Sequence, residues 1–208
     1  MAVHHLTCPP EREAVDQLAV GDLVYITGEI VVTGGLPAHK RLIASLDAGI
    51  PLPMKIEGTF IHLPHMVEET PDGYEIHYVN PTTSTRFDEF MPRLIEALDL
   101  RIVGGKGGLG AASVAAMQKT GCVYLSLLGG GSAILSAAIK EVLQVEWRDF
   151  PSHFRLSRLR VEGLGPLTVG IDAHGHSVYQ TLESNARERL PQILARLADR
   201  RETFSQEQ

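Results

Sequence analysis

Two glycine-rich turns, each set between a short apolar strand and a helical pattern, constrain the fold of this chain most strongly. Leu100-Arg-Ile-Val103 is a short predicted strand that runs into Gly104-Gly-Lys-Gly-Gly-Leu-Gly110, and residues 111–119 then show a helical pattern. Residues 122–128 form a second apolar strand, and Gly129-Gly-Gly-Ser132 separates it from a second helical segment, residues 133–142. Strands that alternate with helices in this way predict an α/β fold.

The second strand, turn and helix together are long enough to be considered as a membrane span. The 20 residues from 120 to 139 carry no charge, which is about the length that a bilayer requires. The glycines at 129–131 divide this stretch into a β-rich half and a helical half, so a buried strand, a turn and a buried helix explain it better. The N-terminus has no basic patch followed by an apolar core, so we expect no signal peptide, no membrane partner and a cytoplasmic protein.

Composition narrows the class of protein. With 208 residues, 44% of them apolar and 21% charged, the chain predicts one globular domain over residues 1–208. A net charge of -6 argues against a nucleic-acid partner, because phosphate binding needs clustered Lys and Arg. Only two cysteines occur, Cys8 and Cys122, so we expect a reducing compartment, no disulfide framework and no metal site in this chain.

Further elements follow from periodicity and turn residues. Asp88 is a candidate N-cap for one helix, and Pro191 is a candidate kink in the last one. Polar residues 68–73 are expected to join two strands. The predicted strands are 23–32, 55–63, 74–79 and one or two within 158–172, and the predicted helices are 38–46, 88–98 and 182–200. The order of these elements predicts a mixed sheet in a single α/β domain.

Residues 105–110 match the pattern G-x-G-x-x-G between a strand and a helix, which leaves three interpretations open. A nicotinamide dinucleotide would need an acidic residue about 20 positions further on, and no Asp or Glu occurs between Gly105 and Ile139. A plain glycine turn would leave Lys106 in solvent. A lysine held among glycines at a helix start would suit a carboxylate.

Asn80-Pro-Thr-Thr-Ser-Thr-Arg86 places four hydroxyls and an arginine just before a helix. The hydroxyls could simply cap that helix. The functional alternative is an anion cradle, in which Arg86 binds a carboxylate and one activated Thr hydroxyl acts as a base. Spacing alone does not select the hydroxyl.

Nine histidines invite a metal hypothesis. The pairs His62/His65 and His174/His176 lack a nearby third ligand, so we interpret them as turn and surface residues. His39 lies in a basic segment at a helix start and could help to bind an anion.

The two motifs together resemble the C-terminal domain of class I fumarate hydratases, which also exists as the free-standing β subunit of L(+)-tartrate dehydratase. Lys106 follows Arg86 by 20 positions. Further matching segments run in order from about residue 18 to 195, namely Gly21-Asp-Leu-Val-Tyr-Ile-Thr-Gly28, Ala38-His-Lys-Arg-Leu42, Gly129-Gly-Gly-Ser-Ala133 and Gly165-Pro-Leu-Thr-Val-Gly-Ile-Asp-Ala-His-Gly175.

The resemblance implies a swivelling β/β/α fold and the reversible dehydration of a small 2-hydroxy (di)carboxylic acid. It implies a [4Fe-4S] cluster, acting as a Lewis acid, whose cysteines belong to an α subunit. Thr82 then corresponds to the base, while Lys106 and Arg86 bind the carboxylates and the developing charge. We also expect substrate contacts at Thr83, His39, Gly105 and Gly107, and a homo- or hetero-oligomer.

Two departures from the family pattern bear on the substrate. Gly34-Gly-Leu-Pro37 stands where the family commonly has Gly-Arg-Asp, so a substrate-binding arginine is missing, and Pro64-His65 replaces Gly-Pro. The sequence therefore leaves the acid and its stereochemistry open. It also leaves open a non-catalytic, carboxylate-binding or regulatory module that keeps the fold.

Overall fold

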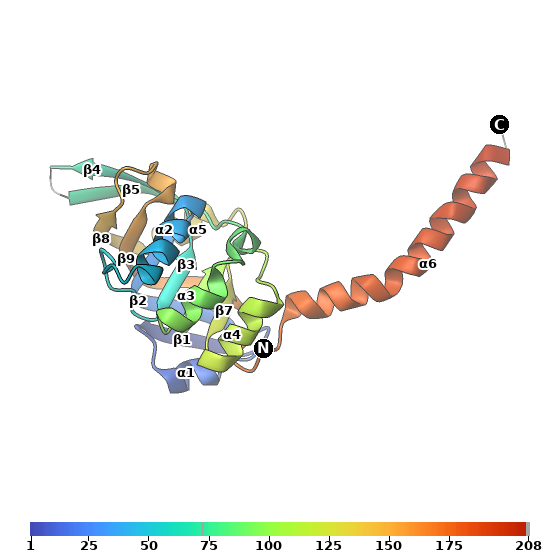
Figure 1. The fold of residues 1–208 in the computed structure, drawn as a ribbon, viewed down its shortest axis with the longest axis horizontal. Coiled ribbons are helices and arrows are strands. Elements are labelled where there is room, and N and C mark those ends of the chain that lie inside the picture. The colour runs from blue at the N-terminus through green and yellow to red at the C-terminus, as the bar shows by residue number, and fades with distance from the viewer. Residues whose placement is uncertain (72, 207–208) are drawn as a thin grey trace.

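A mixed seven-stranded sheet organises the protein (Figure 1). The computed structural model describes residues 1–71 and 73–206. Strands β1, β2, β3, β6 and β7 run parallel to one another, while β9 runs antiparallel to β2, β7 and β8. In the order β1-β2-β3-β6-β7-β9-β8 the strands are Val3–Cys8, Leu23–Thr33, Thr59–His62, Ile102–Gly105, Val123–Ser126, Leu156–Ile171 and Ile139–Glu146.

The sheet closes on itself because two of its strands are unusually long. Strand β2 has 11 residues and pairs with β1, β3 and β9, and β9 has 16 residues and pairs with β2, β7 and β8. The β2–β9 pairing completes a ring through β3, β6 and β7. An α/β fold with a mixed sheet, of the swivelling type that the resemblance implied, is confirmed.

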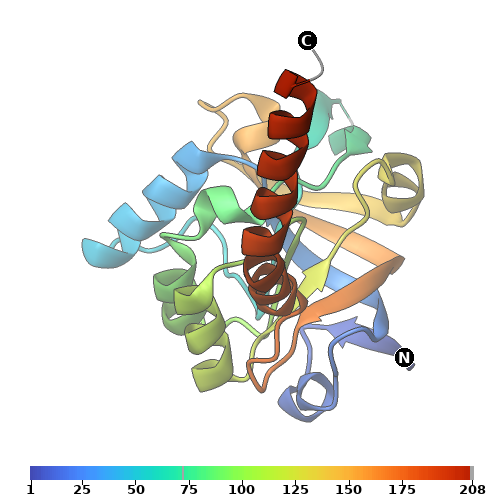
Figure 2. The same ribbon diagram turned by 90° about the vertical axis from the view of Figure 1, so that its right-hand side faces the viewer.

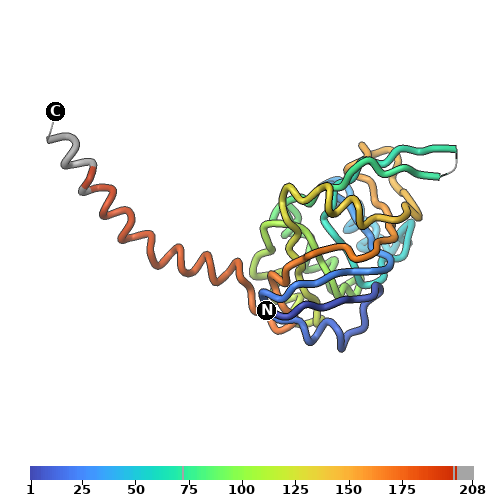
Figure 3. Tube along the Cα trace, turned by 180° about the vertical axis from the view of Figure 1, so that it is seen from behind, coloured from blue at the N-terminus to red at the C-terminus, as the bar shows by residue number. Residues whose placement is uncertain are grey.

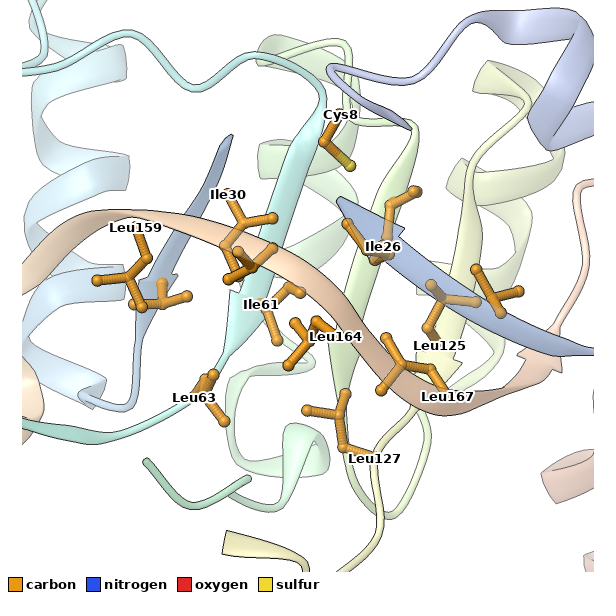
Figure 4. Packing of buried hydrophobic residues seen from close by; sticks show 14 of the residues in the cluster. Cys8, Ile26, Ile30, Ile61, Leu63, Leu125, Leu127, Leu159, Leu164 and Leu167 are labelled. Atoms are coloured by element: carbon orange, nitrogen blue, oxygen red, sulfur yellow. The ribbon is translucent and has the colours of Figure 1, made fainter. Parts of the chain in front are cut away.

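Alternation along the strands creates two cores. In β3, Phe60 and Ile61 point to opposite sides, as do Tyr124 and Leu125 in β7. Ile61 and Leu125 belong to the apolar cluster within the closed sheet, with Leu164 from β9 (Figure 4). Phe60 and Tyr124 belong to a second cluster under three helices, α2 (Leu36–Asp47), α3 (Met91–Ala97) and α4 (Ala111–Thr120).

The remaining elements are short, apart from the last helix. They are α1 (Arg12–Asp16), the hairpin of β4 (His65–Thr70) and β5 (Gly73–Val79), the 3₁₀ helices η1 (Ser84–Phe87) and η2 (Ser152–Phe154), and α5 (Ser132–Ala137). Helix α6 (Val178–Gln206) leaves the body and projects away from it, as the view from behind also shows (Figure 3). Among the described residues, no helix is both long and apolar enough to cross a membrane.

Several sequence predictions need correction. The predicted helix 133–142 ends at Ala137, and Ile139 begins edge strand β8, because pairing with β9 outweighs local helix preference. The predicted connection 68–73 is largely strand: β4 pairs with β5, turning Val67 inward and Glu68 outward. Strand β1 and helix α1 were not predicted.

Other predictions are confirmed with small shifts. Helix α2 has its proline in the first turn, and α4 covers the predicted 111–119. Residues 158–172, which could have held one strand or two, are covered by the single strand β9 apart from Asp172. Helix α6 starts four residues before the predicted Leu182 and continues through Pro191.

Candidate functional site

The structure brings the two predicted motifs together through backbone hydrogen bonds. We call residues 80–88 the site loop. The Thr82 amide donates to the carbonyl of His62 at the end of β3 (3.1 Å), and the Thr82 carbonyl accepts from the Lys106 amide just after β6 (3.0 Å). The Ser84 amide donates to the Lys106 carbonyl (2.8 Å), so Thr83 and Lys106 form a parallel bridge. The site loop thus lies at the carboxyl ends of two neighbouring parallel strands, where α/β sheets commonly bind ligands.

The four hydroxyls of the site loop have different surroundings. The Ser84 hydroxyl is buried and lies 2.8 Å from both His62 Nδ1 and the Tyr124 hydroxyl. Thr85 is exposed on η1, whereas Thr82 and Thr83 are half-buried beside Lys106. Because Ser84 is already hydrogen-bonded in the core, Thr82 and Thr83 are the two hydroxyls best placed to meet a ligand near the lysine.

Two cations flank these threonines. Lys106 is half-buried, and a Cβ built on Gly129 would lie 3.9 Å from its Nζ, so the lysine reaches toward the second glycine turn. Arg86 is exposed at the end of η1. In the part of the chain that the structure describes, neither side chain forms an ion pair with a carboxylate, whereas Arg41, for example, is paired with Asp149. Both cations are therefore available to an anionic ligand.

The glycines beside Lys106 differ in role. A Cβ on Gly105 would lie 2.1 Å from Ser84 Oγ, and the residue has φ +158, so this glycine allows the site loop to pack against β6. Gly107 is exposed, and a Cβ there would lie 3.2 Å from the Thr83 methyl. Of the two predicted backbone contacts, only Gly107 is open to a ligand in this chain.

Asp88 caps a different helix from the predicted one. Its Oδ1 accepts from the Gly110 amide (2.9 Å) and from the Ser113 hydroxyl (2.6 Å) at the start of α4. The N-cap of α3 is Phe90. A carboxylate therefore already occupies the N-terminus of α4, where a dinucleotide would place its pyrophosphate. This contact argues against the nicotinamide interpretation of the glycine motif.

His39 and His62 are buried against the site loop: His62 contacts Ser84, and His39 stacks on Phe87. The prediction that His62 and His65 are turn and surface residues is wrong, because both are strand-end residues with at most 1% exposure. His39 is also fully buried; its Nδ1 donates to the Gly35 carbonyl (2.8 Å) and its ring stacks on Phe87 (4.0 Å between centroids).

Burial sets the charge of these histidines. It lowers the pKa of His39 to about 4 and holds the pKa of His62 well below its usual value, with a further lowering from His39. Both imidazoles are therefore neutral at pH 7. Their Nε2 atoms are buried without a hydrogen-bond partner among the described residues. His39, predicted to contact the substrate, is placed as an uncharged support of the turn at Gly35 and of η1.

Sequence reasoning did not identify the chain of contacts from His62 through Ser84 to Tyr124. These residues come from β3, the site loop and β7, and they meet only because β3, β6 and β7 are neighbours in the sheet. The one available signal was a serine among threonines in the loop, which does not predict a buried role.

The turn at Gly34-Gly-Leu36 is closed by another segment. A Cβ on Gly35 would lie 2.6 Å from the Cβ of Phe154 in η2, so a larger side chain at this position would displace η2. Leu36 is 39% exposed. Arg41 is paired with Asp149 and lies over the Phe150 ring at 3.9 Å. The N-terminus of α2 therefore exposes an apolar side chain, and Arg41 on the same helix is already paired.

The described residues do not fit an iron–sulfur cluster. No group of three or more His, Cys, Asp or Glu side chains among them could hold a metal ion. Cys8 and Cys122 lie in different core clusters, and burial raises the pKa of both thiols, that of Cys8 to about 11. Such thiols resist the deprotonation that ligation requires.

Comparisons with known proteins identify the family of this chain. The chain is 32% identical over 174 residues to the L(+)-tartrate dehydratase subunit beta of Escherichia coli K12, which covers 83% of this chain and 85% of the relative. A tartrate dehydratase subunit beta provisionally named in Methanocaldococcus jannaschii is 29% identical over 88% of this chain and 94% of its own. A provisionally named class I fumarate hydratase of Geobacillus stearothermophilus is 31% identical over 90% of this chain, but only 36% of that relative is matched. The family described as fumarase C-terminus matches residues 3–182, and the chain belongs to this family.

Proposed function

We propose that this chain is the β subunit of a two-subunit hydro-lyase that reversibly dehydrates a small 2-hydroxy acid. The observation that carries the proposal is the bridge between Thr83 and Lys106. It holds two half-buried threonines beside a lysine that has no carboxylate partner among the described residues. The names of the relatives, tartrate dehydratase subunit beta and fumarate hydratase, support the same reaction class.

Each side chain then has a chemical role. Arg86 and Lys106 bind carboxylate oxygens of the substrate. The Thr82 oxygen, in its deprotonated form, takes the proton from C3, the carbon next to the one that carries the hydroxyl. The C–H electron pair forms the double bond between C2 and C3, the C2–O bond breaks, and the hydroxyl that leaves combines with the abstracted proton as the product water. Lys106 offsets the negative charge that develops during proton removal. Thr83 and the exposed backbone at Gly107 position the substrate.

The rest of the active site is assigned to a partner. Thr82 and Lys106 are only half-buried in this chain, and dehydration of this kind favours a site closed to water. The class I fumarate hydratase relative is nearly three times longer than its matched region, so it contains in one chain what an α subunit would supply here. We assign the [4Fe-4S] cluster to that α subunit, because the residues that the structure describes offer no suitable set of ligands, and we place the enzyme in the cytoplasm.

The apolar turn at Gly35 points to a less charged substrate. Of the three basic residues that follow this turn in the sequence, His39 is neutral, Arg41 is paired with Asp149, and Lys40 is exposed. A second substrate carboxylate buried here without a partner would lose roughly 2–5 kcal/mol. We therefore infer that the substrate carries an uncharged or bulkier group at this position.

The test is co-expression with the α chain, the polypeptide that matches the part of class I fumarate hydratase absent here. The complex is assayed anaerobically on malate, L-tartrate and alkyl-substituted 2-hydroxy acids. We expect dehydration, with the highest kcat/KM for a substituted acid. A preference of about tenfold for malate or tartrate, roughly 1.4 kcal/mol, would contradict the substrate inference. Binding of these acids without turnover by the assembled complex would instead favour the non-catalytic module.

A further inference from the structure

Helix α6 exposes a row of large apolar side chains to solvent, which is unusual for a helix that packs against no partner. We call its part from Leu182 onward the C-terminal arm. The arm projects from the body, and in Figure 2 it lies in front of the body, on the viewer's side. At the base of α6, Tyr179 packs against Tyr124. The large apolar side chains of the arm are 46–61% exposed, namely Leu182, Leu190, Ile193, Leu194 and Leu197.

These side chains form one stripe. Leu182, Ala186, Leu190, Ile193 and Leu197 follow one another at spacings of four, four, three and four residues, which places them on one face of an α-helix. Two shallow hollows lie along this face, one lined by Leu182, Ala186 and Leu190 and the other by Ile193 and Leu197. The stripe is continuous and suits a long apolar partner surface.

One edge of the stripe is basic. Arg189, Arg196 and Arg200 are exposed and follow at spacings of seven and four, so they lie along the same side of the stripe and border its hollows. On the other edge, Glu183 is already ion-paired with Arg187 (2.6 Å). For the part of the arm whose side chains the structure describes, a complementary partner would carry carboxylates along one side.

This charge pattern disfavours a second copy of the chain as the partner. An antiparallel two-fold pair of arms sets each edge against its own copy, which brings the three arginines against three arginines. A parallel pair sets them against Glu183 and Arg187, whose charges already compensate each other. The exposed helix face is also small, about 25 Å by 10 Å, far below the roughly 800 Å² per partner of a stable interface. The arm is suited to extend a larger interface.

The arm also lies beyond the region that defines the family, which ends at residue 182. Most of it therefore lies outside the residues that the family model matches. In a two-subunit enzyme, contacts between chains must supply the association that a covalent link supplies in a single-chain relative. An arm attached to the β subunit would serve this purpose.

We propose that the C-terminal arm docks into an apolar groove of the α subunit that is bordered on one side by Asp and Glu. The inference rests on the proposed two-subunit function for the identity of the partner. It assigns to Leu190 and Leu197 the central apolar contacts, and to Arg196 and Arg200 the charged edge.

The test measures binding of the full-length chain to the purified α chain by calorimetry. The apolar-face variant is Leu190→Glu with Leu197→Glu, and the matched control is Gln192→Glu with Ala195→Glu, which adds the same charge to the opposite face of the same helix. We expect the first to raise Kd at least tenfold and the second less than twofold. Arg196→Glu with Arg200→Glu should slow association, and added salt should reduce this difference.

The outcomes separate this inference from the proposed function. Circular dichroism checks that each variant keeps its helix content. Equal binding by both double variants would overturn the arm's role even if the complex is active, and so would a wild-type chain that forms no complex. A homodimer of the isolated chain that Leu190→Glu dissociates would assign the arm to a second copy instead. An assembled, arm-dependent complex without dehydratase activity would refute the proposed function and leave the arm's role intact.

Discussion

The site loop and the C-terminal arm differ in how far contacts within this chain hold them in place. The loop is fixed by backbone hydrogen bonds to His62 at the end of β3 and to Lys106 just after β6. Its residue Ser84 is fully buried, in contact with His62 and Tyr124. The arm leaves leucines such as Leu182, at 61% exposure, in solvent. The difference teaches that the site loop is held in place by contacts within this chain, whereas the arm has few such contacts among the described residues. Variants should therefore separate chemistry from assembly.

The largest effect is expected at the site loop. Thr82→Ala and Lys106→Ala should each lower kcat of the assembled complex by about 10²–10⁴-fold, because a base and a charge-stabilising group act mainly in the transition state. Binding to the α chain and the unfolding free energy should change little. Thr85→Ala, an exposed hydroxyl three residues away, is the matched control. Near-normal kcat in Thr82→Ala with every substrate would show that the base is misassigned.

The same substitution in the two regions compares them directly. Leu164→Ala, at a fully buried position of β9, should lower the free energy of unfolding by about 2–5 kcal/mol. Leu190→Ala in the arm, where the side chain is 50% exposed, should cost less than about 0.5 kcal/mol. Urea denaturation of the isolated chain measures both. Similar losses would mean that the arm packs on the body.

Acid should destabilise the body. His39 and His65 have pKa values near 4 in the folded protein against 6.5 when unfolded, because burial disfavours the charged form. The unfolded chain therefore binds more protons, and stability is complete above pH 6.5 and is lost as pH falls toward 4, by about 3 kcal/mol for each histidine. Residues 182–198 of the arm contain no histidine. Denaturation midpoints that stay constant from pH 7 to 4.5 would contradict buried neutral histidines.

A smaller effect is expected from the support of the site loop. Ser84→Ala leaves His62 Nδ1 and the Tyr124 hydroxyl buried without their shared partner, at a cost of about 1–3 kcal/mol. The binding of the arm to the α chain should be unaffected. Thermal unfolding and calorimetry measure the two properties. Unchanged stability would indicate that the serine hydroxyl is not held as the structure shows.

Elements with strong local patterns could be predicted from the sequence. The alternation of β2 and the proline at the start of α2 depend on neighbouring residues alone, and both elements were predicted within a few residues. Strand β8 and the capping role of Asp88 depend on contacts with segments distant in the chain. Local propensity does not contain that information, so both were assigned wrongly.

The candidate site divides in the same way. Arg86 and Lys106 could be proposed from the two motifs, and Thr82 could be proposed only through the resemblance of these motifs to a known family. Their support by His62 and Tyr124 could not, because it arises from the order of strands in the sheet. His39 was predicted as a basic contact from its neighbours, and only its burial shows that it is neutral.

The central claim, that this chain supplies half of a shared active site, is tested most directly by titrating it into a fixed amount of the α chain with its cluster loaded. Dehydration of the best substrate is followed anaerobically at each ratio. The account predicts no activity from either chain alone, a linear rise and a plateau at one chain to one, with Thr82→Ala reaching the same stoichiometry of binding but no comparable rate. Full activity from the α chain alone, or from this chain alone, would contradict it.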